Sequence, residues 1–165
     1  MPGIFSNLRE IAAARRTDLR MDVINFRVTI PTSGNITQPT AEKLRNDYEY
    51  LVTKINAAMT GVGNTANVAT ADTQYDDVDE IRFNLRESGT GENLFTTDVE
   101  LSTLVNSRDG NTTGGLDFNP YGHKIGRGAD LSITFTRRAT SITTQRIVVV
   151  QLVCLLVPIA LKQKV

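Results

Sequence analysis

Hydrophobic and polar positions alternate with a period of two residues along several short stretches of the chain. Between residues 22 and 30, the apolar side chains of Ile24, Phe26, Val28 and Ile30 alternate with polar ones. This spacing is typical of a strand with one buried face. The same alternation recurs around residues 81–85 and 131–135, and turn sequences rich in Gly, Ser and Asn separate the stretches. The pattern predicts an antiparallel β-sandwich or barrel.

A longer apolar run lies near the C-terminus and extends from residue 147 to residue 161, with Gln151 and Pro158 inside it. Its fifteen residues are fewer than the roughly 20 that a transmembrane helix needs. Its high content of β-branched residues favours a strand that is buried on both faces, at the centre of a sheet. Pro158 is expected to end that strand.

The first residues of the chain show helical spacing instead. Apolar residues recur there every three or four positions, with arginines among the polar ones; the apolar residues are Ile4, Phe5, Leu8, Ile11, Ala12 and Leu19. We therefore expect an N-terminal helical arm over residues 1–21, followed by one domain over residues 22–165. The arm would pack on its own domain or on a neighbour, or lie on a membrane surface.

The stretch from residue 40 to residue 59 is ambiguous. Its apolar positions fit a helix that begins after Pro39 and Thr40, but Tyr50, Val52 and Lys54 also alternate in a β-favouring segment. Periodicity alone favours the helix.

The composition fits one globular domain. The chain has 165 residues, of which 40% are hydrophobic, and its 18 Lys and Arg balance 18 Asp and Glu. The charges are unevenly placed, since residues 72–100 hold nine acids and two bases and residues 124–165 hold seven bases and one acid. These charges either mix on the folded surface or bring together acidic and basic faces of neighbouring copies. Direct binding to nucleic acid is disfavoured because the domain is not basic overall.

Few chemical sites can be built from these residues. The single cysteine and single histidine exclude an internal disulfide and a Cys-His zinc cluster. Cys154 lies inside the apolar run and is expected in the core. His123 has no nucleophile or metal ligand at a recognisable spacing, and the acids of residues 76–80 lack the spacing of a calcium loop. The sequence predicts no catalytic residue, cofactor or metal, and favours a structural or binding role.

The order of segments resembles the jelly-roll coat proteins of viruses. The resemblance rests on five stretches and is closest to the small single-barrel coat proteins of tail-less icosahedral phages that enclose a membrane; the stretches are Ile81 to Leu85, Leu94 to Leu104, Asp117 to Pro120, Gly128 to Phe135 and Ile147 to Val157. It implies an all-β fold, an antiparallel jelly-roll β-sandwich behind a short N-terminal helical arm, in which residues 47–59 are a strand.

The resemblance also implies a function. The chain would be a structural virion protein, a capsid subunit that assembles with other copies of itself into an icosahedral shell in the host cytoplasm. It leaves open a second capsid protein and contact between the arm and an internal viral membrane. The charge pattern and the arm predict the residues of the subunit interface, which are Arg9, Arg15, Arg16, Asp76, Asp77, Asp79, Glu80, Arg137 and Arg138.

Two other functions remain open. A carbohydrate-binding or receptor-binding β-sandwich, such as a phage spike or a lectin, would need a surface platform of aromatic side chains, for which the four tyrosines are the candidates. An enzyme would have to use His123 together with the acids of residues 76–80.

The start of the chain lacks the pattern of a secretory signal, which predicts that the protein stays in the cytoplasm or in a particle assembled there.

Overall fold

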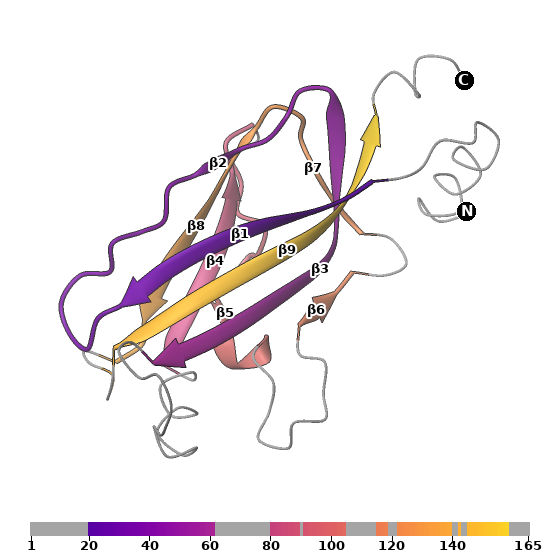
Figure 1. Ribbon diagram of the computed structural model, residues 1–165. Helices are drawn as coiled ribbons and strands as arrows, with labels where there is room; N and C mark the ends of the chain where they lie inside the picture. The colour runs from indigo at the N-terminus through magenta and orange to yellow at the C-terminus, as the bar shows by residue number, and fades with distance from the viewer. Residues whose placement is uncertain are drawn as a thin grey trace.

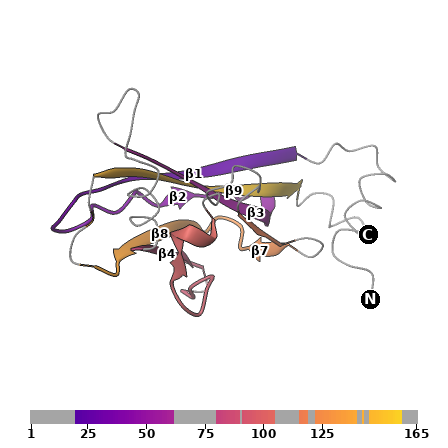
Figure 2. The ribbon, with the colours of Figure 1, turned by 90° about the horizontal axis from the view of Figure 1, so that it is seen from below.

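The computed structural model describes residues 20–61, 80–89, 91–104, 115–118, 122–139, 142 and 145–158. These residues form two antiparallel sheets that face each other. Figure 2 shows the two layers, with β1 and β9 in one and β4 and β8 in the other. The predicted all-β sandwich is therefore confirmed.

The first sheet has five strands. Its path runs β1-β9-β3-β6, and the short strand β7 also pairs with β3 (Figure 1). The strands span Arg20–Ile30 (β1), Arg146–Pro158 (β9), Tyr48–Gly61 (β3), Leu116–Asp117 (β6) and His123–Ile125 (β7).

The second sheet has four strands in the order β2-β8-β4-β5. They span Glu42–Lys43 (β2), Asp130–Arg137 (β8), Ile81–Glu87 (β4) and Val99–Glu100 (β5), and a single 3-10 turn, η1 (Leu101–Thr103), follows β5. The apolar run at residues 99–105 is therefore a strand for only two residues. Leu101 and Leu104 then lie one turn apart and both point into the core, a spacing that a 3-10 turn satisfies.

Four of the pairings between the strands are nested, whereas the pairings of β3 with β9 and of β4 with β8 join neighbouring pairs within each sheet. The first strand pairs with the last, β1 with β9, and inside that pair lie β2 with β8, β3 with β6 and β7, and β4 with β5. Successive pairs alternate between the two sheets. The chain is thus arranged as one long hairpin that is wrapped across both layers.

The core lies between the sheets and is formed by the alternating positions that the sequence indicates. Phe83 of β4 is fully buried, and its ring centroid lies 6.0 Å from that of Phe95 and 6.2 Å from that of Phe135. The other sheet contributes the inward side chains of β1 and β9, which are Ile24, Phe26, Val28, Ile30, Val148, Val150, Leu152 and Cys154. β9 lies between β1 and β3 and ends at Pro158, as predicted. No helix among the described residues is long and apolar enough to cross a membrane.

The helix that periodicity favours over residues 40–59 is wrong. The stretch holds β2 and most of β3, and the error has a structural cause. Val52 and Lys54 oppose adjacent residues of β9, so Thr53 is an extra residue, a β-bulge. The buried positions therefore shift phase from Tyr50 and Val52 to Ile55 and Met59, and the resulting spacing of three and four residues imitates a helix.

The predicted arm lies almost wholly outside the described residues. Its last two residues, Arg20 and Met21, are already part of β1, so the strand begins two residues before the expected boundary. The polar segments after β3 and after η1 also lie outside the described ranges.

Candidate functional site

His123 lies in a small hollow at the start of β7. The hollow has a volume of about 170 Å³, and Glu87, Glu92 and Leu131 also line it. The imidazole is half-buried beside the ring of Phe118, with the ring centroids 6.4 Å apart. Burial lowers the pKa of His123, and the opposing influence of Glu87 is smaller. The histidine is therefore held in its neutral form at pH 7.

The acids around this histidine have structural contacts. Glu87 accepts a hydrogen bond from the backbone N–H of Gly126 through its Oε1, at 2.8 Å, and so ties the end of β4 to the turn before β8. Of the acids proposed to act with His123, Asp76, Asp77 and Asp79 lie outside the described residues. Nowhere in the described part of the chain do three or more His, Cys, Asp or Glu gather as metal ligands would.

The Cys154 thiol is buried in the core, as the sequence predicts. Burial raises its pKa to about 12, so the thiol is protonated at physiological pH. A protonated thiol inside an apolar layer is a poor nucleophile. Cys154 therefore acts as a small apolar residue of β9.

Two of the four tyrosines are described, and neither forms an open aromatic platform. Tyr50 is only 3% exposed, and its hydroxyl accepts a hydrogen bond from the N–H of Arg45. Tyr48 is half-buried, and the guanidinium of Arg45 lies 4.8 Å from the centre of its ring. The other two tyrosines lie outside the described residues.

The described parts of the acidic and basic stretches meet within one copy of the chain. β4 from the acidic stretch pairs with β8 from the basic stretch, and the N–H of Arg138 donates to the carbonyl of Glu80 at 2.8 Å. Arg82 also forms an ion pair with Glu100 at 3.0 Å, and Lys124 with Glu49 at 3.2 Å. The two stretches are thus joined by backbone hydrogen bonds, and each of these two ion pairs uses a charge of one stretch only.

The predicted interface residues therefore have different surroundings. The side chain of Arg138 is exposed, whereas Arg137 is half-buried and donates hydrogen bonds to the carbonyls of Pro31 and Gly34. Glu80 is half-buried beside Arg138. Arg9, Arg15, Arg16 and the three aspartates of residues 76–79 lie outside the described ranges.

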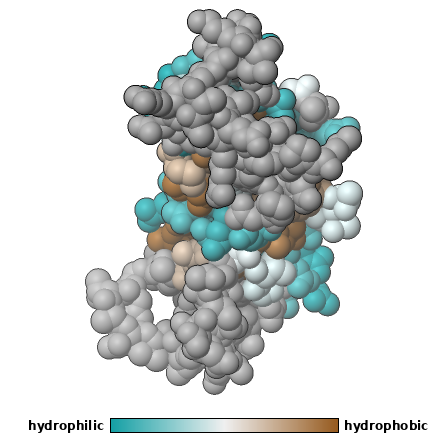
Figure 3. Space-filling view, turned by 90° about the vertical axis from the view of Figure 1, so that its right-hand side faces the viewer, coloured by the Kyte–Doolittle hydropathy of each residue, from teal (hydrophilic) through white to brown (hydrophobic). Residues whose placement is uncertain are grey.

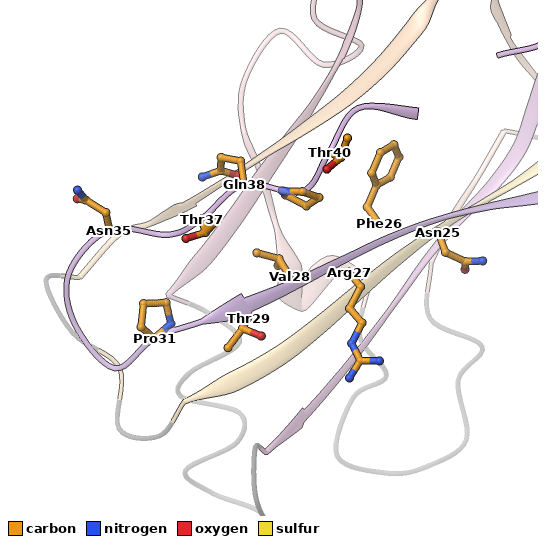
Figure 4. Close-up of a pocket in the computed structure, with 11 residues that line it drawn as sticks. Asn25, Phe26, Arg27, Val28, Thr29, Pro31, Asn35, Thr37, Gln38 and Thr40 are labelled. Atoms are coloured by element: carbon orange, nitrogen blue, oxygen red, sulfur yellow. The ribbon is translucent and has the colours of Figure 1, made fainter. Parts of the chain in front are cut away.

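A cavity of about 680 Å³ lies between β1 and the segment that follows it. Asn25 to Thr29 form one side and residues 35–40 the other. Figure 4 shows that Phe26 and Val28 point from β1 toward this segment, while Asn25 and Arg27 point away from it. The segment is fastened to the opposite sheet, because the side-chain amide of Gln38 bonds both backbone groups of Phe135 in β8.

The outer face of the first sheet carries apolar side chains as well. Leu51, Leu155 and Val157 form a second buried cluster, separate from the main core. In the same cross-strand row, Met21 lies opposite Leu155 and is 61% exposed, and the next outward residue of β1, Val23, is 46% exposed. Seen from the right-hand side of Figure 1, the described surface shows hydrophobic residues among hydrophilic ones (Figure 3).

Only some of these features can be predicted from the sequence. The apolar run in β9, interrupted only by Gln151, and the adjacent Leu51 and Val52 are the signal for apolar groups on both sheet faces. The roles of Gln38 and Arg137 have no sequence signal, because their partners are backbone groups about 100 residues away.

No known family matches the chain, and no curated protein has significant similarity to it.

Proposed function

We propose that the sandwich is a jelly roll and that the chain is a capsid subunit, a structural protein of a virus particle that assembles from many copies. The nesting of the strand pairs is the observation that carries the proposal. Four nested pairs, taken alternately by two sheets, are what results when one long hairpin wraps into a double-sheet jelly roll, a fold used by viral coat proteins.

A second observation supports a role in assembly rather than in chemistry. A sandwich that works alone has an apolar inner face and a polar outer face on each sheet. The first sheet departs from this pattern at β9, where five of the six outward residues are apolar. Leu155 and Val157 are already buried in the second cluster of the chain, and Ile147, Val149 and Val153 are half-buried. Repeated contact through such faces builds closed shells when the rotation between subunits closes.

Charge would then set the register of these contacts more than their strength. Arg138 is the described interface candidate best suited to a test, because its side chain is exposed and Arg137 has a structural role in its own chain. We expect Arg138→Glu to weaken assembly and to leave folding intact. Sedimentation velocity at low and high salt measures this effect, with Lys43→Glu, at an exposed cation outside both charged stretches, as the control. Assembly equal in the wild type and in Arg138→Glu, at every salt concentration, would contradict the electrostatic part of the proposal.

The alternative is a carbohydrate- or receptor-binding module, because jelly rolls also occur in lectins. The cavity beside β1 favours it, since its lining includes Asn, Thr and Gln side chains of the kind that bind sugar hydroxyls. Against it stand the buried ring of Tyr50 and the covered ring of Tyr48. A glycan array that shows saturable binding, lost in Asn35→Ala, would favour this function over the capsid proposal.

A further inference from the structure

The free edge of β1 is the feature that carries an inference beyond the proposed function. β1 is the outermost strand of its sheet and pairs with β9 alone over all eleven of its residues. Its second backbone edge has no strand partner within the described part of the chain. An open edge of this length is a template for another strand, and proteins normally shorten, bend or cover it.

The two halves of this edge differ. The half from Asn25 to Thr29 faces the cavity, and residues 35–40 stand across from it (Figure 4). The half from Arg20 to Ile24 lies outside the lining of that cavity and carries both of the exposed large hydrophobic side chains found among the described residues, Met21 and Val23. An edge without a strand partner and exposed apolar side chains thus coincide on the same few residues, where the N–H of Val23 donates to Oδ1 of Asp22 in its own chain at 2.9 Å.

We propose that the start of β1 pairs with the start of β1 of a second copy, antiparallel and about a two-fold axis at Met21, so that residues 20–22 of the two copies lie side by side and connect the two first sheets at this point. The inference extends the proposed self-assembly by naming one of its contacts. A two-fold axis requires a surface that is complementary to itself, and the start of β1 has this property because a cation and an anion flank Met21.

Cross-strand charge selects the register. With the axis at Met21, the exposed side chains of Arg20 and Asp22 stand opposite each other twice, once on each side of the axis. With the axis at Asp22, two carboxylates would oppose each other, which is destabilising. With the axis at Val23, Arg20 would face the buried Phe26. The axis at Met21 also places Met21 and Val23 of both copies on one face of the joined strands. There Val23 of each copy lies diagonally across from Met21 of the other, within reach of its side chain.

Variants with one added cysteine test this geometry directly. The native Cys154 is buried, with a pKa of about 12, and so gives no background. Met21→Cys should form a disulfide-linked dimer under mild oxidation, because directly opposite residues meet the distance that a disulfide requires. Val23→Cys is the matched control, since a four-residue offset places the two copies of residue 23 about 13 Å apart. Val23→Cys that crosslinks as readily as Met21→Cys, or Met21→Cys that stays uncrosslinked, would overturn the proposal.

A charge swap supplies the second measurement. Arg20→Asp and Asp22→Arg should each raise the dissociation constant of the dimer about 2- to 30-fold, given two cross-strand ion pairs, and the double variant should restore it. Failure of the double variant to restore affinity would overturn the register. The outcomes separate the two proposals: large assemblies without the Met21→Cys crosslink would refute the β1 pairing alone, and crosslinked dimers that never grow larger would refute the capsid function alone.

Discussion

The side chain of Gln38 serves as a strand partner for Phe135. Its Nε2 donates to the carbonyl oxygen of Phe135 at 2.9 Å, and its Oε1 accepts from the N–H of the same residue at 2.7 Å. An amide side chain thus satisfies both backbone groups of one residue of β8. This pair of hydrogen bonds holds the segment after β1 against the second sheet and defines one wall of the cavity beside β1.

Gln38→Ala should lower the free energy of unfolding by about 1–3 kcal/mol, because it leaves partly buried backbone groups of Phe135 without their partner. Urea denaturation followed by circular dichroism measures the change. Thr37→Ala, at the neighbouring exposed position, is the control and should alter stability by less than about 0.5 kcal/mol. Equal stability of the two variants would show that the Gln38 side chain does not hold this segment.

The two adjacent arginines at the end of β8 should behave differently. Arg137→Ala removes the donor to the carbonyls of Pro31 and Gly34 and should lower the free energy of unfolding by about 1–2 kcal/mol, after allowance for its partial exposure. Arg138→Ala removes an exposed side chain and should change it by less than about 0.5 kcal/mol. Thermal denaturation of both variants distinguishes the structural arginine from the surface one. The reverse order of stabilities would contradict this assignment.

Phe83 should be one of the positions least tolerant of truncation. Its ring is fully buried against Phe95 and Phe135, so Phe83→Ala should cost about 3–5 kcal/mol through lost burial and the cavity that remains. Phe83→Leu keeps most of the apolar volume and should cost less than half as much. Chemical denaturation of both variants gives the comparison. A loss below about 1 kcal/mol for Phe83→Ala would place this ring outside the tightly packed core.

His123 should make stability depend on pH. Burial lowers its pKa in the folded protein, so below pH about 6.5, the ordinary histidine value, the unfolded chain binds more protons than the folded one. The contribution of the neutral imidazole to the free energy of unfolding is therefore fully present above that pH. It decreases as the pH falls toward the lowered pKa of His123 in the folded protein. Because the chain has one histidine, His123→Gln should remove this component. Urea midpoints between pH 5 and 7.5 that fall equally in both proteins would contradict it.

The elements predicted from sequence are those in which burial alone sets the pattern. Buried and more exposed residues alternate in β1 and in most of β8, the apolar residues of β4 alternate with polar ones although Asn84 is also buried, and β9 is a long apolar run, so their strands follow from the sequence pattern. β3 could not be predicted in this way, because the bulge at Thr53 changes which residues face the core. Its partner β9 lies about 100 residues away, and no local signal shows that two strands there share an irregular register.

The candidate contact surfaces could be predicted from the sequence only in part. Local charge counts indicate acidic and basic stretches, but they do not show that β4 and β8 bring the two together inside one chain. The exposed position of Met21 follows from the strand order, which leaves β1 at the edge of its sheet. Strand order is set by pairings between distant segments, and a single sequence contains no direct record of them.

Light scattering coupled to size-exclusion chromatography, with negative-stain images of every large peak, tests self-assembly most directly. We expect oligomers that grow with protein concentration and respond to salt, with closed rings or shells among the largest species. A protein that stays monomeric over the whole range of concentration and salt would contradict it.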